Sequence, residues 1–114
     1  KFVRNKTISL IRDCEVVLSH CSAAISYAIL LKKPIIFLLS NEYIRSFDNY
    51  TPAVLAKKLN SLYFNIDDKN NNSKIKNINL FKVDNKKYKI YKDDYIKYPS
   101  SINKKFWKIF NEKI

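Results

Sequence analysis

Glycine and methionine are both absent from this chain of 114 residues. Without glycine the chain carries neither the GxGxxG fingerprint of dinucleotide-binding folds nor a P-loop, since both need residues without a side chain. A Rossmann-type dehydrogenase and a P-loop NTPase are therefore not expected. Because no methionine marks a translation start, we expect a piece of a longer protein or a processed product.

Cysteine and histidine are also scarce, with Cys14, Cys21 and His20 the only copies. Two cysteines, one expected at a helix end and one in a turn, do not make the disulfide framework of a small secreted protein. Adjacent side chains normally diverge, so His20 and Cys21 favour neither a Cys–His nucleophile nor a zinc site. We therefore expect reduced cysteines in a cytoplasmic protein, and no bound metal.

Long apolar runs and arginine are missing as well. The longest apolar run falls far short of the roughly 20 residues that a membrane span needs. Lysine supplies 19 of the 22 basic residues behind the net charge of +12. Because nucleic-acid readers usually depend on arginine, no specific nucleic-acid partner is expected. A basic face suits anionic substrates, or peripheral contact with the anionic inner face of the cytoplasmic membrane.

The chain does contain a polar turn between apolar segments, within residues 14–41. A short apolar run at residues 15–19 predicts a buried parallel strand. Ser22 stands at the expected N-cap of a helix over residues 23–31, which Pro34 ends before a second strand at 35–39. This is one βαβ unit, and backbone N–H groups at the start of its helix would form an anion site that phosphate usually occupies.

The flanking segments extend this pattern to half of a doubly wound α/β domain. A helix is expected at residues 7–12 and a polar loop at residues 40–50. Thr51 and Pro52 predict the start of a further helix, whose apolar face holds Val54, Leu55, Leu59 and Leu62. A third strand follows at residues 63–66. We thus predict a single, partial α/β domain over residues 1–114, made of a βαβ core (1–66), a polar loop (67–77) and a C-terminal helical segment (78–114).

The C-terminal segment leaves two interpretations open. Residues 79–83 predict a short extended stretch, and Asp84 suits the cap of a helix with Tyr88, Tyr91, Tyr95 and Tyr98 on one face. A hairpin is the rival, since Tyr88 and Ile90 also alternate with lysines. We interpret the tyrosine face as packing. A last helix is expected to pack back on the domain through Phe106, Trp107, Ile109 and Phe110.

The candidate binding residues follow the first two strands. Ser19, His20, Cys21 and Ser22 form either a cradle for a diphosphate or a capped helix that binds nothing. Asn41 and Glu42 follow the second strand, where loops point into the same crevice. Glu42 either accepts hydrogen bonds from a ribose or base or is an exposed acid. Asp67 and Asp68 are interpreted as a solvated turn.

The stretch VVLSHCSAAISYAILLKKPIIFL, residues 16–38, resembles the C-terminal, donor-binding half of GT-B-type glycosyltransferases. The nearest likeness is to bacterial surface-carbohydrate and capsule enzymes, and to teichoic-acid glycerophosphotransferases. The likeness covers residues 12–66, and residues 95–98 and 106–110 are similar to the closing helices of the surface-carbohydrate group. Nucleotide-sugar epimerases of the same fold share the strand–turn–helix–Lys-Pro pattern.

The resemblance implies a Rossmann-like half domain in which Ser22 holds the donor diphosphate, with Ser19, His20 and Cys21 in the same turn. Ser26 stands where the family often has an acid that faces the ribose or sugar. The implied function is transfer of a sugar, or a polyol phosphate, from a nucleotide-sugar or CDP-polyol substrate to a surface glycan or lipid-linked acceptor. The catalytic base belongs to an N-terminal domain that this chain lacks, so the chain alone is expected to be inactive, with no cofactor. The alternatives are an epimerase-like enzyme and a non-catalytic interaction module.

Overall fold

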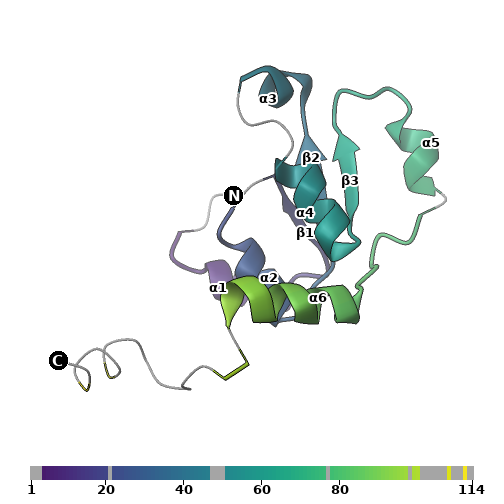
Figure 1. The fold of residues 1–114 in the computed structure, drawn as a ribbon. Coiled ribbons are helices and arrows are strands. Elements are labelled where there is room, and N and C mark those ends of the chain that lie inside the picture. Colours follow the sequence, from purple (N-terminus) through teal and green to yellow (C-terminus); the bar gives the residue numbers. More distant parts are fainter. Residues whose placement is uncertain are drawn as a thin grey trace.

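The computed structural model describes residues 4–20, 22–46, 51–76, 78–97, 99–100, 108 and 112. These form one small open sheet flanked by helices (Figure 1). In chain order the elements are α1 (Thr7–Asp13), β1 (Val17–Ser19), α2 (Ile25–Leu30), β2 (Ile35–Leu39), α3 (Asn41–Ser46), α4 (Thr51–Leu59), β3 (Leu62–Asn65), α5 (Asn71–Lys76), α6 (Asn85–Tyr91) and the π-helical turn η1 (Lys92–Ile96).

The three strands pair in parallel in the order β1-β2-β3. Val17 lies beside Ile35 in the register of the first pair, and Ile36 lies beside Leu62 in that of the second. The predicted parallel sheet is therefore confirmed. The fold is α/β and is compatible with half of a Rossmann-like domain.

One face of the sheet carries the core. Ile35 and Phe37 alternate along β2 and are buried with Ala28 and Ile29 of α2 and with Ala56 and Leu59 of α4. When two successive connections between parallel strands have the same handedness and both lead toward the same side of the sheet, their helices lie on the same face of the sheet. This accounts for the position of α2 and α4 on one face. On the opposite face, Leu18 of the edge strand β1 keeps 62% of its surface exposed.

The C-terminal segment closes this core as a helix, so the hairpin alternative is wrong. Asp84 caps α6 by accepting a hydrogen bond from the Lys87 N–H at 3.0 Å, and also accepts one from the Asn60 amide. These hydrogen bonds lower the pKa of Asp84 below its usual value. Tyr88 is buried in the core and Tyr91 packs half-buried against it, whereas Tyr95 is exposed, so the packing interpretation holds for the first two of the predicted tyrosines. Tyr98 lies outside the described residues.

Other predictions for local structure were wrong. Residues 41–46 and 71–76 form helices where loops were predicted, residues 79–83 form no strand, and Leu62 belongs to β3 rather than to the preceding helix. Side chains account for both new helices: Ser40 Oγ accepts the Tyr43 N–H, and Asp68 accepts the Asn70 N–H and pairs with Lys74 at 2.7 Å. The four residues predicted to pack a last helix back on the domain, Phe106, Trp107, Ile109 and Phe110, lie outside the described residues.

Two helices end in the left-handed conformation although the chain has no glycine. Lys32 follows α2 with φ 53°, and Asn60 follows α4 with φ 52°. In each case the next residue's N–H bonds back over a full turn, Lys33 to Ala28 O at 2.9 Å and Ser61 to Ala56 O at 2.8 Å. These are Schellman ends, in which glycine is the usual residue at the left-handed position.

We expect Lys32→Gly to raise the free energy of unfolding by about 0.5–1 kcal/mol. A side chain in the left-handed region costs about 1–2 kcal/mol, and the greater freedom of glycine in the unfolded chain offsets part of the gain. Urea denaturation of both proteins measures the difference. Asn60→Gly is the control and should not gain stability, because the substitution removes the hydrogen bonds of the Asn60 side chain with Asp84 and Lys82. A loss of stability in Lys32→Gly would contradict the prediction.

Candidate functional site

The carboxyl ends of all three strands meet at one edge of the sheet, which we call the carboxyl edge. A pocket of 270 Å³ opens there and is lined by His20, Leu38, Leu39, Ser40, Tyr43 and Ile66. The His20 ring meets the Tyr43 ring edge-on at 5.7 Å between centroids. His20 is exposed, so its ring nitrogens have access to a ligand in this pocket.

A hydrogen-bonded network joins the ends of β2 and β3. Asp67 accepts the Asn41 N–H at 2.6 Å, Asn65 Nδ2 donates to Asn41 Oδ1 at 2.8 Å, and the Asp67 N–H bonds Asn65 Oδ1 at 3.0 Å. Asn41 therefore stabilises the carboxyl edge, and its backbone N–H is already bonded to the Asp67 carboxylate. Glu42 is exposed in the first turn of α3 and does not line the pocket beside it.

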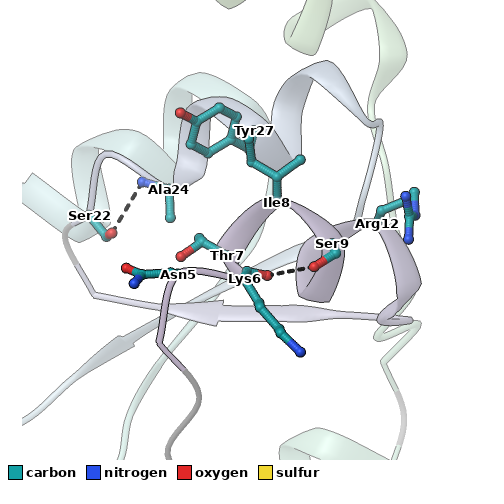
Figure 2. Close-up of a pocket in the computed structure, with 9 residues that line it drawn as sticks. All are labelled: Asn5, Lys6, Thr7, Ile8, Ser9, Arg12, Ser22, Ala24 and Tyr27. Carbon is teal, nitrogen blue, oxygen red and sulfur yellow. Dashed lines mark hydrogen bonds between the residues drawn. The ribbon is translucent and has the colours of Figure 1, made fainter.

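A second pocket, of 680 Å³, lies between α1 and the start of α2 (Figure 2). The view shows the Asn5 amide and the Thr7 hydroxyl on the same side of the pocket as Ser22, whereas the Lys6 side chain extends away. Four hydroxyl groups and two cationic side chains belong to its lining, which consists of Asn5, Lys6, Thr7, Ile8, Ser9, Arg12, Ser22, Ala24 and Tyr27. This composition suits a polar, anionic ligand.

The turn at Ser22 differs from the predicted cradle. Ser22 Oγ accepts the Ala24 N–H at 3.2 Å, so Ser22 closes a local turn two residues before the N-cap, Ala24. The N–H groups of Ile25 and Ser26 bond the carbonyls of Ser22 and Ala23 at 3.1 Å. The N–H groups of Ala24, Ile25 and Ser26, which were expected to hold phosphate, are thus bonded within the turn. Ser22 itself lines the pocket, and its hydroxyl donates to no acceptor among the described residues.

The two cations of this pocket are not equivalent. Arg12 donates to both carboxylate oxygens of Asp13, at 2.8 and 3.2 Å. This hydrogen bonding raises the pKa of Arg12 and lowers that of Asp13. The charge of Arg12 is largely balanced by its neighbour, whereas Lys6 pairs with no acid among the described residues but extends its side chain away from the pocket.

The remaining predicted site residues are spread over the same region. Ser19 ends β1 and is half-buried, Ser26 is half-buried in α2 and lines neither pocket, and Cys21 lies outside the described residues. The structure therefore brings His20 and Ser22 to two neighbouring pockets rather than to one.

Sequence reasoning missed Ser40, Tyr43 and Asn5 as lining residues. Ser40 carried a usable signal, since a serine directly after a strand commonly caps a following helix. Tyr43 and Asn5 carried none, because the chain brings them to His20 and Ser22 only through tertiary packing.

Within the described ranges no group of three His, Cys, Asp or Glu side chains is arranged to hold a metal ion. The Cys14 thiol is free and donates to the Ile11 carbonyl at 3.2 Å. No helix among the described residues is long and apolar enough to cross a membrane.

Comparison with protein-family models, curated protein sequences and solved structures finds no match to this chain. Any assignment of function therefore depends on the geometry and chemistry of the two pockets.

Proposed function

We propose that this chain is the donor-binding part of a GT-B-type glycosyltransferase, which moves a sugar or a polyol phosphate from a nucleotide donor to a bacterial surface glycan. The observation that carries the proposal is the parallel sheet whose carboxyl edge opens between two pockets, one beside His20 and one beside Ser22. In open α/β sheets, ligands bind outside the carboxyl ends of the strands.

The two pockets divide the donor between them in this proposal. The larger one takes the diphosphate through hydrogen bonds from the Ser22 and Thr7 hydroxyls and the Asn5 amide, and Lys6 adds positive charge nearby although its side chain extends away. The smaller one is mostly apolar, with the His20 and Tyr43 rings on its wall, and suits a base or a sugar face. The role of this chain is then to position the donor and to stabilise the charge of the leaving nucleotide.

A nucleotide titration tests this assignment. We expect UDP or CDP to bind the 114-residue chain in the millimolar to high micromolar range, which corresponds to about 4–6 kcal/mol, because few hydrogen bonds form in an open crevice. Amide chemical shifts should change at residues 5–7, at His20 and Ser22, and at Tyr43. Ser22→Ala should weaken the affinity by about 1 kcal/mol, or roughly fivefold, through loss of one donated hydrogen bond.

Ser73→Ala is the matched control for this titration. Ser73 lies in α5, where its hydroxyl bonds the Asn70 carbonyl, away from both pockets. Unchanged affinity in this variant would show that the Ser22 effect is local. Two results would overturn the proposal: no shifts at millimolar nucleotide, or shifts confined to the lysines of α6 and η1.

A further inference from the structure

The lysines of this protein are unevenly distributed. Among the described residues, eight lysines lie in or next to α6, η1 and the C-terminal ends of α2 and α4, elements that pack against one another. Figure 1 shows α6 at the opposite end of the sheet from α3. We call this region the basic surface, and its lysines are Lys32, Lys57, Lys58, Lys82, Lys86, Lys87, Lys89 and Lys92. All except Lys92 are exposed. Positive charge is therefore concentrated at one end of the described structure.

The acids on these elements do not cancel that charge. They are Asp84, Asp93 and Asp94, and neither α2 nor α4 contributes another. Asp84 is engaged in capping α6 and in bonding Asn60. Asp93 lies against Lys89 at 2.6 Å and Lys92 at 3.7 Å. The surface therefore keeps an excess of positive charge, and opposite charge on a partner would complement it.

Apolar side chains are exposed between these lysines. Ile90 is 48% exposed and Tyr95 is 60% exposed. A hollow of 460 Å³ on one side of α6 is lined by Leu30, Lys32 and Lys89 among others, and one of 230 Å³ on the other side by Lys58, Lys87 and Ile90. Lys58 Nζ meets the Tyr95 hydroxyl at 2.7 Å and the face of its ring at 4.6 Å from the centroid. Ammonium groups thus surround exposed apolar and aromatic groups.

We infer that the basic surface docks on an anionic lipid bilayer. Lysine heads reach phosphate and carboxylate headgroups while their stems, with Ile90 and Tyr95, lie at the boundary with the acyl chains. The described arginines, Arg4, Arg12 and Arg45, lie outside this surface. A nucleic-acid surface normally uses arginine, and it does not need exposed aliphatic side chains. The carboxyl edge, at the other end of the strands, stays open to ligands in this orientation (Figure 1).

Vesicle binding by the full 114-residue chain tests the inference. We expect co-sedimentation with vesicles of equimolar phosphatidylcholine and phosphatidylserine, weakening as salt rises, and none with phosphatidylcholine alone. The double variant Lys86→Glu, Lys87→Glu should bind more than about tenfold more weakly, because each lysine near an anionic membrane contributes substantially. Ile90→Ser should also weaken binding, which loss of charge alone does not explain.

The matched control is the double variant Lys69→Glu, Lys76→Glu, which changes the net charge equally at exposed positions before and in α5. Its vesicle binding should stay within about twofold of the original protein. Equal losses in the two double variants would show a non-specific charge effect and overturn the inference. So would absence of vesicle binding, or binding to duplex DNA or polyglutamate that depends on Lys86 and Lys87 while vesicles are not bound.

Discussion

Phe37→Ala should lower the free energy of unfolding by about 3–5 kcal/mol, as is usual when a buried phenylalanine is truncated. Phe37 is fully buried on the central strand, and it packs within the cluster that α2 and α4 form over the sheet. Small domains have only about 5–15 kcal/mol of stability in total. The variant should therefore unfold at a much lower urea concentration, or fail to fold at neutral pH. Circular dichroism during urea denaturation measures the change.

Two further variants keep this prediction testable. Phe81→Ala makes the same substitution in a turn where the ring is 58% exposed, and it should cost under about 1 kcal/mol. Phe37→Leu conserves most of the buried volume and should cost under about 1.5 kcal/mol, so it reports on the site even if Phe37→Ala does not fold. Equal effects of Phe37→Ala and Phe81→Ala would contradict the assigned core.

The sheet was predictable because each strand carries its own signal. The apolar runs near Val17, Phe37 and Phe64 are short and continuous, as expected of buried parallel strands, and Pro34 separates helix from strand within the βαβ unit. Right-handed connection of successive parallel strands then leaves few topologies. The parallel direction of the three strands follows from these local features, whereas their order, β1-β2-β3, is a finding of the structure.

The short polar helices were not predictable in the same way. α3 has no buried residue, and its first N–H is held by Asp67, which lies 26 positions along the chain. α5 is likewise polar, and Asn71 bonds back to the Asn65 carbonyl at the end of β3. A contact with a distant segment supports α3, whereas polar contacts with residues just before it support α5. Hydrophobic periodicity carries no information about either kind of contact.

The candidate site was predicted in position but not in detail. Placing His20 and Ser22 at the carboxyl edge follows from the strand–turn–helix order alone. In the structure the Ser22 hydroxyl closes a local turn instead of capping the helix. The N-cap is Ala24, with φ −60° and ψ −20°, so α2 starts two residues later than predicted. The same serine is compatible with a helix cap and with a local turn, and its residue type does not distinguish them.

Tyr88→Ala is expected to lower the free energy of unfolding by about 3–5 kcal/mol, although Tyr88 lies outside the βαβ unit. Its ring is 3% exposed and belongs to the same cluster as Phe37. Its hydroxyl donates to the Lys33 carbonyl at 2.9 Å, across 55 positions of sequence. α6 is therefore part of the core rather than an appendage. Tyr95→Ala, at a side chain that is 60% exposed, is the control and should cost less than about 1 kcal/mol.

Tyr88→Phe separates the ring from its hydroxyl. At neutral pH it should cost about 1 kcal/mol, the usual net value of one hydrogen bond. Burial raises the pKa of Tyr88 above its ordinary value of 10.0, so the folded protein keeps the phenol neutral where the unfolded chain ionises it. The unfolded state then binds fewer protons, and stability falls as pH rises above about 10. The difference in the free energy of unfolding between the original protein and Tyr88→Phe should therefore become smaller above about pH 10. Urea denaturation at pH 7, 9 and 10.5 measures this difference. A difference that is constant across these pH values would mean that the Tyr88 hydroxyl is in contact with solvent, and that α6 does not pack against the sheet through it.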